Sequence, residues 1–215
     1  GFSANFKSIY SSIDKRAQTI SQKSFLDLYK KGKVYYAEAP TLWCTECRCA
    51  VAQSELENVD IKSTFNYIKF YISGTNEYIE VATTRPEMLC ACVCVFINPE
   101  DEKHKHLLNK KLVVPFYNFE VPVYADELVD LEKGTGVVMC CTFGDTVDKE
   151  WQRKHNLPIK EAFNNSGIMN EIAGEFAGLP IVKARKAIIE KLSELGLLIK
   201  QENIEHAVSI HDRCN

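Results

Sequence analysis

Two carboxylates three residues apart, Asp145 and Asp148, are the first candidates for chemistry in this sequence. They follow the segment Gly134–Cys141, in which two glycines precede an apolar run typical of a buried strand. Gly144 and Asp145 then predict the start of a helix. Asp145 would cap that helix, and Asp148 could point back over the strand end and hold a small cation such as an ammonium. The alternative is that both carboxylates only cap the helix and complement its dipole.

A second polar cluster follows a predicted hairpin and comprises Thr83, Thr84, Arg85 and Glu87, with Pro86 between the charged pair. Proline disfavours a helix at the residue before it and suits the first turn of a new one. Hydroxyls, a guanidinium and a carboxylate at one strand end can bind a polyhydroxyl or phosphate-bearing ligand. The alternative is a capped turn beside an exposed ion pair.

A third candidate site joins the two ends of the sequence. Cys44 and Cys47 form a C-x-x-C knuckle, and His211 and Cys214 form an H-x-x-C pair. Two ligands at this spacing can take adjacent tetrahedral corners, so together they predict a Cys₃His structural zinc site. The alternative is an incidental C-x-x-C with His211 on the surface.

Composition limits the class of protein. The chain has 215 residues, 46% of them hydrophobic and 26% charged, which is enough apolar material for a globular core. A net charge of −3 argues against a general nucleic-acid binder but allows a specific RNA partner. No apolar run is long enough for a membrane span and no signal peptide is evident, so we expect a cytoplasmic protein. His104 and His106 are expected to be solvated.

Nine cysteines are an unusually high and odd number. Five of them lie in strand-like runs, which predicts small buried side chains in a reducing compartment and no disulfide framework. These five are Cys90, Cys92, Cys94, Cys140 and Cys141.

The elements that must position these residues are mostly short strands. Apolar periodicity predicts helices over 13–31, from 145 onward and over 181–195, with a short polar helix over 100–108. Strands are predicted over 34–40, 91–97, 111–115, 120–125, 134–141 and 197–200, and a hairpin over 64–84. This order favours an α+β fold: a mostly antiparallel β-barrel with peripheral helices. Residues 1–60 would form a helix, a strand and half of a small zinc-ribbon-like base, 61–196 the barrel, and 197–215 the returning half of the base.

Several of these segments resemble the editing insertion, connective polypeptide 1, of class I aminoacyl-tRNA synthetases, most closely its valyl form. The likeness extends over nearly the whole chain. The matching segments are Ile20–Phe25, Trp43–Cys47, Ala52–Glu57, Val81–Glu87, Gly134–Gly136 and the Asp145/Asp148 pair. The H-I-G-H and K-M-S-K-S signatures of a synthetase catalytic domain are absent from the sequence. The resemblance therefore implies an excised insertion that edits but does not aminoacylate, with no catalytic cofactor and no use for ATP or Mg²⁺.

The resemblance also implies a role for each matching residue. Asp148 would anchor the α-ammonium of a misattached amino acid, and Asp145 would contact the hydroxyl of threonine. Further residues would line the pocket or face the terminal adenosine and place a water: Met139 and Cys141 in the pocket, Thr83, Thr84, Arg85 and Glu87 at the bend, and Lys133 near the base. The commoner bacterial pattern has lysine at the position of Met139 and Thr-Pro-Ala-His before the first aspartate, where this chain has Cys141–Gly144.

The function implied is post-transfer editing, the hydrolysis of threonyl-tRNA(Val) to threonine and tRNA. The expected partners are the 3′ end of tRNA(Val) carrying threonine and the remainder of the synthetase, with the chain itself a monomer. Two alternatives stay open. One is the editing insertion of an isoleucyl- or leucyl-tRNA synthetase, and the other is a non-catalytic zinc-ribbon β domain that docks RNA or protein.

Overall fold

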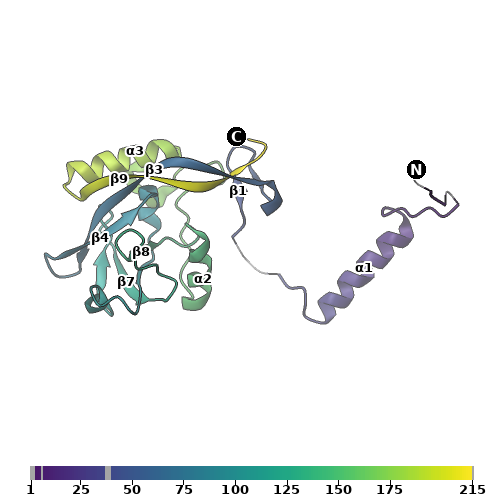
Figure 1. Ribbon diagram of the computed structural model, residues 1–215, viewed down its shortest axis with the longest axis horizontal. Coiled ribbons are helices and arrows are strands. Elements are labelled where there is room, and N and C mark those ends of the chain that lie inside the picture. The colour runs from purple at the N-terminus through teal and green to yellow at the C-terminus, as the bar shows by residue number, and fades with distance from the viewer. Residues whose placement is uncertain (1–2, 6, 37–39, 215) are drawn as a thin grey trace. The chain divides into compact units, whose positions relative to one another are not determined.

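The computed structural model describes residues 3–5, 7–36 and 40–214 (Figure 1). The chain divides into two compact units, Gly1–Ala39 and Pro40–Asn215, and each is described by itself. The boundaries expected from the sequence, after residues 60 and 196, remain a prediction.

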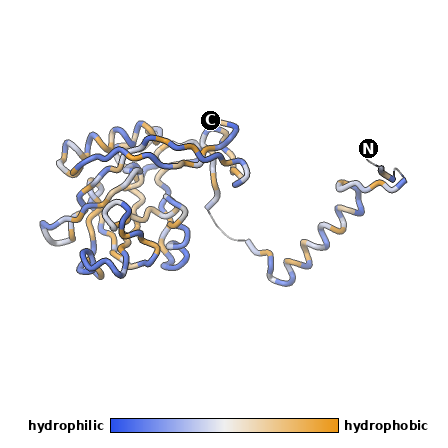
Figure 2. The backbone as a smooth tube through the Cα atoms, in the orientation of Figure 1, coloured by the Kyte–Doolittle hydropathy of each residue, from blue (hydrophilic) through white to orange (hydrophobic). Residues whose placement is uncertain are grey.

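The first unit contains helix α1 (Lys15–Lys30), close to the predicted range. The side chain of Asp14 caps it by accepting a hydrogen bond from the N–H of Ala17 at 2.7 Å. None of its described residues is buried, and its apolar residues Ile20 and Phe25 are exposed. Apolar and polar positions alternate along the helix (Figure 2). Capping and helix propensity, and not tertiary packing, therefore support α1 within its unit.

A long two-stranded ribbon runs through the second unit. Strand β3 (Leu56–Ile72) pairs antiparallel with β9 (Leu198–His211), from Leu56 opposite His211 to Ile68 opposite Leu198. β3 then turns into β4 (Tyr78–Thr83), which confirms the predicted hairpin. The far end of the ribbon projects from the body toward the small pair β1 (Trp43–Cys44) and β2 (Cys49–Ala50) (Figure 1).

The main sheet curls on itself. It contains β6 (Lys111–Val113), β7 (Glu120–Ala125), β5 (Cys94–Ile97) and β8 (Val137–Cys140) in the order β4-β3-β6-β7-β5-β8. Among the described strand pairs, only β5 with β7 is parallel. Strands β4 and β8, at the two ends of this order, contact each other. In the loop before β8, a Cβ at Gly134 would lie 3.1 Å from that of Ala82 in β4. The result is a curled half-barrel in a mixed α+β fold, which confirms the predicted fold class.

Two helices cover this sheet. Helix α3 (Ile181–Glu194) buries Ala184, Ile188 and Leu192 against the main core, because these residues repeat at helical spacing. Helix α2 (Thr146–His155) packs Trp151 on Phe96 of β5, with ring centroids 4.3 Å apart. The apolar segments of the second unit gather in its strands and on the inner side of α3 (Figure 2).

Other predicted elements differ from those observed. Residues 34–36 form no strand, and 37–39 lie outside the described residues. The predicted helix over 100–108 is a set of turns that ends in the 3₁₀ turn η3 (Lys105–Leu107), because Asp101 accepts main-chain hydrogen bonds from Lys103 and His104. His104 is 6% exposed and its Nδ1 lies 2.6 Å from Asp101 Oδ2, so the expectation of a solvated His104 was wrong.

The strand predicted over 91–97 begins only at Cys94, because Ala91 belongs to the 3₁₀ segment η2 (Pro86–Ala91). The last strand continues past Lys200 to His211, because β3 gives its backbone a partner throughout. Two further 3₁₀ segments are η1 (Gln53–Glu55) and η4 (Glu171–Phe176). No helix among the described residues is long and apolar enough to cross a membrane.

Candidate active site and metal cluster

The two predicted carboxylates lie at the start of α2. The helix begins at Thr146, so Asp145 stands at the N-cap position and is exposed, whereas Asp148 is the third helical residue and is 4% exposed. Asp148 Oδ2 accepts a hydrogen bond from the N–H of Asp145 at 3.0 Å, as an acid at this position does in a capping box. No ion pair among the described residues involves Asp148. Asp148 therefore caps the helix and has no cationic partner in the part of the chain that the structure describes.

Burial raises the pKa of Asp148 above the usual range for aspartate. Hydrogen bonds from the N–H of Asp145, the thiol of Cys140 and the N–H of Gly144 oppose this shift without cancelling it. Because an opposite charge favours the ionised form of a carboxylate, a cationic group at Asp148 would relieve the cost of its burial.

Gly144 allows Asp148 to fold back over the strand end. A Cβ at position 144 would lie 2.9 Å from Asp148 Oδ2, 3.6 Å from the Cβ of Cys141 and 3.9 Å from Met88 Cε. Real Cβ atoms essentially never show a contact of 2.9 Å, so any side chain at this position would force the Asp148 carboxylate or the backbone to shift. Gly144 therefore lies in direct contact with the carboxylate.

The threonine-arginine bend follows β4. Thr83 Oγ1 accepts a hydrogen bond from the N–H of Arg85 at 3.0 Å, which fixes the turn, and Thr84 is half-buried. The Glu87 side chain is fully buried, and Arg185 of α3 binds both of its oxygens, each at 2.8 Å. This carboxylate raises the pKa of Arg185. Glu87 is thus the buried member of its ion pairs, whereas Arg185 is 39% exposed.

Arg85 connects the threonine-arginine bend to the segment Gly144–Asp148. Its Nη1 donates a hydrogen bond to the carbonyl oxygen of Gly144 at 2.6 Å, and its Nε lies 3.3 Å from Glu87 Oε1. The bend and the carboxylate corner are 59 residues apart in sequence, so closure of the sheet brings them together. Thr83, Arg85, Gly144 and Asp148 form one continuous site.

The remaining predicted residues lie around this site in different ways. Cys141 is buried next to Gly144, and its role as a pocket residue remains a prediction. Met139 is half-buried on β8 opposite Val95, and Lys133 is exposed in the loop before that strand. No hydrogen bond or ion pair between described residues ties either of them to Asp148.

The five cysteines predicted to be buried are buried, although only Cys94 and Cys140 of them lie in strands. Cys90, Cys92, Cys94, Cys140 and Cys141 are buried and free. Burial raises the pKa of Cys90 to about 11, which keeps its thiol protonated at neutral pH. These side chains serve as small hydrophobic groups in the core.

A broad groove of about 1150 Å³ lies elsewhere, beside the outward face of β4 and the loop at Gly134. Its lining includes neither Asp148 nor Arg85. Carboxylates dominate the charged groups in it, so it does not suit an RNA backbone. They are Glu77, Glu80, Glu100, Asp101 and Glu102.

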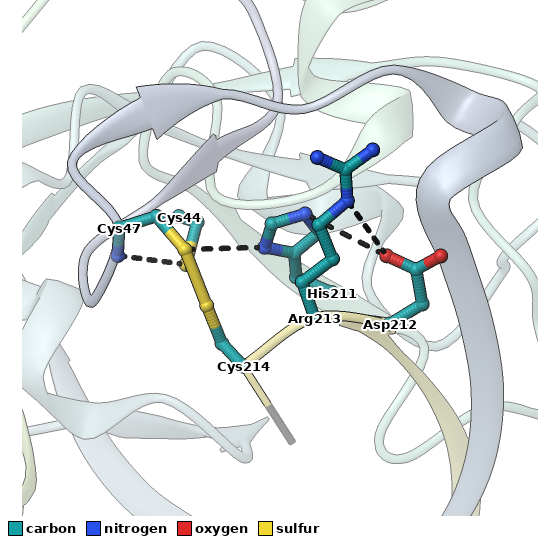
Figure 3. Close-up of a disulfide and its surroundings, with 6 residues drawn as sticks. All are labelled: Cys44, Cys47, His211, Asp212, Arg213 and Cys214. Atoms are coloured by element: carbon teal, nitrogen blue, oxygen red, sulfur yellow. Dashed lines mark hydrogen bonds and ion pairs between the residues drawn. A yellow bond between two sulfur atoms is a disulfide. The ribbon is translucent and has the colours of Figure 1, made fainter.

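The predicted metal ligands converge at the far end of the ribbon, where Leu56 pairs with His211 (Figure 3). Ligand atoms of Cys44, Cys47, His211 and Cys214 all lie within 4.8 Å of one another. Cys44 Sγ is 3.7 Å from Cys214 Sγ, and Cys47 Sγ is 3.6 Å from His211 Nδ1. A tetrahedral zinc ion with ordinary bond lengths would separate two sulfurs by about 3.8 Å and a sulfur from a nitrogen by about 3.5 Å. These two distances fit a metal.

In the structure, the sulfurs of Cys47 and Cys214 are joined as a disulfide (Figure 3). The sequence predicted both residues as metal ligands, and antiparallel pairing of β3 with β9 brings their two segments together. Their Cα atoms are 7.2 Å apart, beyond the usual range of about 4.4–6.8 Å for a disulfide. Only the reduced form of this cluster offers all four ligands to a metal.

The chain is similar in sequence to known proteins along nearly its whole length. A family model described as "Leucyl-tRNA synthetase, editing domain" matches residues 99–193. The valine–tRNA ligase of Haloarcula marismortui is 44% identical over 99% of this chain, and that of Pyrococcus furiosus is 47% identical over 98%. The chain covers only 24% of the length of each. The chain belongs to the editing domains of class I aminoacyl-tRNA synthetases.

A solved structure shows that this editing domain has a known fold. The relative is a leucyl-tRNA synthetase of Agrobacterium radiobacter K84 in a ternary complex with tRNA and LeuAMS. It aligns with a TM-score of 0.50 and 17% identity, over 91% of this chain and 33% of that one. At this identity the likeness concerns the fold alone.

Three residues that contact the predicted Asp148 and Glu87 side chains were missed by the sequence analysis. Arg185 lies 98 residues from Glu87, and nothing in the pattern of α3 distinguishes it from the neighbouring lysines. Cys140 was assigned to the core, yet its thiol also lowers the pKa of Asp148. Gly144 was noted only as the end of a strand, although a glycine before a capping pair could have signalled close packing.

Proposed function

We propose that this editing domain hydrolyses threonine from threonyl-tRNA(Val), as a part of a valyl-tRNA synthetase. The observation that carries the proposal is the hydrogen bond from Arg85 to the carbonyl of Gly144, because it joins the threonine-arginine bend to the Asp148 corner. The identity to valine–tRNA ligases supports the valyl assignment.

In this proposal Asp148 receives the α-ammonium of the misattached amino acid. Its buried carboxylate has no cation partner among the described residues, so an ammonium would supply the missing charge. Exposed Asp145 contacts the threonine hydroxyl at the rim, and Cys141 and Met139 form the apolar wall. Thr84 places the attacking water, because its hydroxyl can both donate and accept.

The bend and the β8 loop would hold the terminal adenosine. Thr83 and Arg85 face the ribose, and Lys133 approaches the base. Glu87, whose two oxygens are bonded to guanidinium groups, supports Arg85 from behind and does not contact the ligand directly.

The reaction is attack of water on the ester carbonyl between the amino acid and the ribose, with the ribose hydroxyl as the leaving group. Because such an ester is already labile, positioning and fixed dipoles can supply most of the acceleration without a protein nucleophile. The need for editing is an established property of valyl-tRNA synthetases, whose valine pocket rejects threonine by only about 10²-fold. A second pocket that hydrogen-bonds a hydroxyl discriminates against valine, which would leave polar groups unpaired.

We further propose that reduced Cys44, Cys47, His211 and Cys214 hold a structural zinc ion. Bound there, zinc would tie the knuckle to the end of the ribbon and take no part in the hydrolysis. We propose that the domain acts as a monomer in the cytoplasm, beside the remainder of the synthetase.

The test is a deacylation assay with the 215-residue chain on threonyl-tRNA(Val) and valyl-tRNA(Val). We expect hydrolysis of the threonyl ester only, and its loss in Asp148→Ala with the fold retained. Glu150→Gln is the matched control, because Glu150 is an exposed acid on the same helix.

Other outcomes would overturn the assignment. Unchanged hydrolysis in Asp148→Ala would refute the role of Asp148. Hydrolysis of valyl-tRNA(Ile) in place of threonyl-tRNA(Val) would assign the domain to an isoleucyl-type enzyme. Binding of tRNA without turnover of any ester would identify a docking module.

A further inference from the structure

Arg185 stands out because it lies on a covering helix and yet is joined to the site by hydrogen bonds. Its Nε and Nη2 each lie 2.8 Å from one oxygen of Glu87, a two-pronged pairing that fixes both distance and orientation. Lys183 and Lys186, the nearest cationic residues of α3, are exposed and belong to none of the ion pairs among the described residues.

Glu87, held in place by Arg185, also contacts Arg85. The same oxygen that receives Arg185 Nη2 lies 3.3 Å from Arg85 Nε, so the two guanidinium groups share one buried carboxylate. Arg85 is about a third exposed and would otherwise be free to change rotamer. Pairing with a fixed carboxylate limits where its other end, Nη1, can point.

The last link connects Arg85 to the acidic corner. Nη1 holds the carbonyl oxygen of Gly144 at 2.6 Å, and the α-carbon of Gly144 leaves no room for a Cβ beside Asp148 Oδ2. The next residue, Asp145, donates its N–H to that same carboxylate oxygen. A shift of the Gly144 peptide would therefore move two groups that define the place of Asp148.

We propose that Arg185 is a positioning residue for ester hydrolysis, which acts through Glu87, Arg85 and the Gly144 carbonyl to hold the Asp148 carboxylate in place. The inference rests on the proposed function for its effect on catalysis, whereas the hydrogen-bonded chain itself can be tested without a substrate. A lysine cannot replace Arg185 fully, because a single ammonium does not match the planar two-oxygen pairing.

The experiment compares four variants with the unmodified chain. Arg185→Met removes the first link, and Arg185→Lys keeps only its charge. Glu87→Met with Arg185→Met removes both partners of this ion pair, so that no buried carboxylate is left without Arg185, and Arg85 keeps its bond to the Gly144 carbonyl. Lys186→Gln is the control on the exposed side of the same helix. The measurements are kcat and KM for threonyl-tRNA(Val), thermal unfolding, and hydrogen exchange of the Asp145 amide by NMR.

We expect kcat to fall about 10–100-fold in Arg185→Met and in the double variant, because a displacement of about 1 Å can cost that much. KM should change by less than about threefold, since no substrate contact is removed. Exchange of the Asp145 amide should accelerate about tenfold, the equivalent of one weakened hydrogen bond. For Arg185→Lys, kcat and amide exchange should lie between those of Arg185→Met and those of the unmodified chain. Lys186→Gln should match the unmodified chain in both.

A double variant that regains both stability and full kcat would overturn the proposal, because it would show that Arg185 serves stability alone. Unchanged amide exchange in Arg185→Met would also overturn it. If Arg185→Met does not fold, the double variant decides. If the unmodified chain hydrolyses no ester, the proposed function fails, and amide exchange in the variants still decides whether Arg185 holds the Asp148 corner.

Discussion

Gly144→Ala is the substitution that most directly tests the packing at the Asp148 corner. The new Cβ would lie 2.9 Å from Asp148 Oδ2, whereas ordinary van der Waals contacts begin at 3.4 Å. Either the carboxylate or the Gly144 peptide must move by about half an ångström, since side chains in a packed interior have little free space. The movement weakens the hydrogen bond from the Asp145 N–H, which is 3.0 Å long.

The expected cost follows from the loss of that bond on a buried carboxylate. An unsatisfied buried polar group costs about 1–3 kcal/mol, and each kcal/mol lowers Tm by about 2–4 °C in a domain of this size. Deacylation of threonyl-tRNA(Val) should fall about 10–100-fold, because the group proposed to hold the ammonium is displaced. Thermal unfolding and single-turnover deacylation measure the two effects.

A double-mutant cycle shows whether Asp148 is the cause. In the Asp148→Ala background the carboxylate is gone, so adding Gly144→Ala should cost less than about 0.5 kcal/mol more. If Gly144→Ala destabilises both backgrounds equally, the contact with Asp148 does not explain the glycine, and the reasoning from packing is wrong.

Two further predictions concern the metal and acid stability. After reduction and incubation with zinc, the chain should carry about one zinc ion, measured by mass spectrometry, and Cys44→Ser should lower this to near zero; reduced protein without zinc would contradict the site. Burial alone would raise the pKa of Asp126, but hydrogen bonds from Lys154, the Leu128 N–H and His155 hold it below the usual range. A lowered folded-state pKa contributes stability at neutral pH that is lost as pH falls below about 3.9. Asp126→Asn should therefore lower the free energy of unfolding by about 1–3 kcal/mol at pH 7, measured by urea denaturation. The free energy of unfolding should then depend less on pH below about 3.9 than in the unmodified chain, whereas the exposed control Glu127→Gln should change neither.

The sequence by itself determined the local elements and the chemistry available. Helical spacing in 181–195 identified α3, and alternation over 64–84 identified the hairpin of β3 and β4. Spacing also marked Cys44 and Cys47, with His211 and Cys214, as one ligand set, which the structure brings together. The helix, the hairpin and each half of the ligand set depend on residues close together in the sequence, whose periodicity and spacing are properties of the local chain.

The tertiary structure alone decided how distant residues meet. No local pattern shows that Arg185 would bind Glu87, or that Arg85 would reach the Gly144 carbonyl, because closure of the sheet and side-chain rotamers set both contacts. The same holds for the length of β9, whose polar residues form a strand because β3 offers paired main-chain groups. The reason is general: a hydrogen bond between distant segments depends on where the backbone places both partners, and that placement is a property of the whole fold.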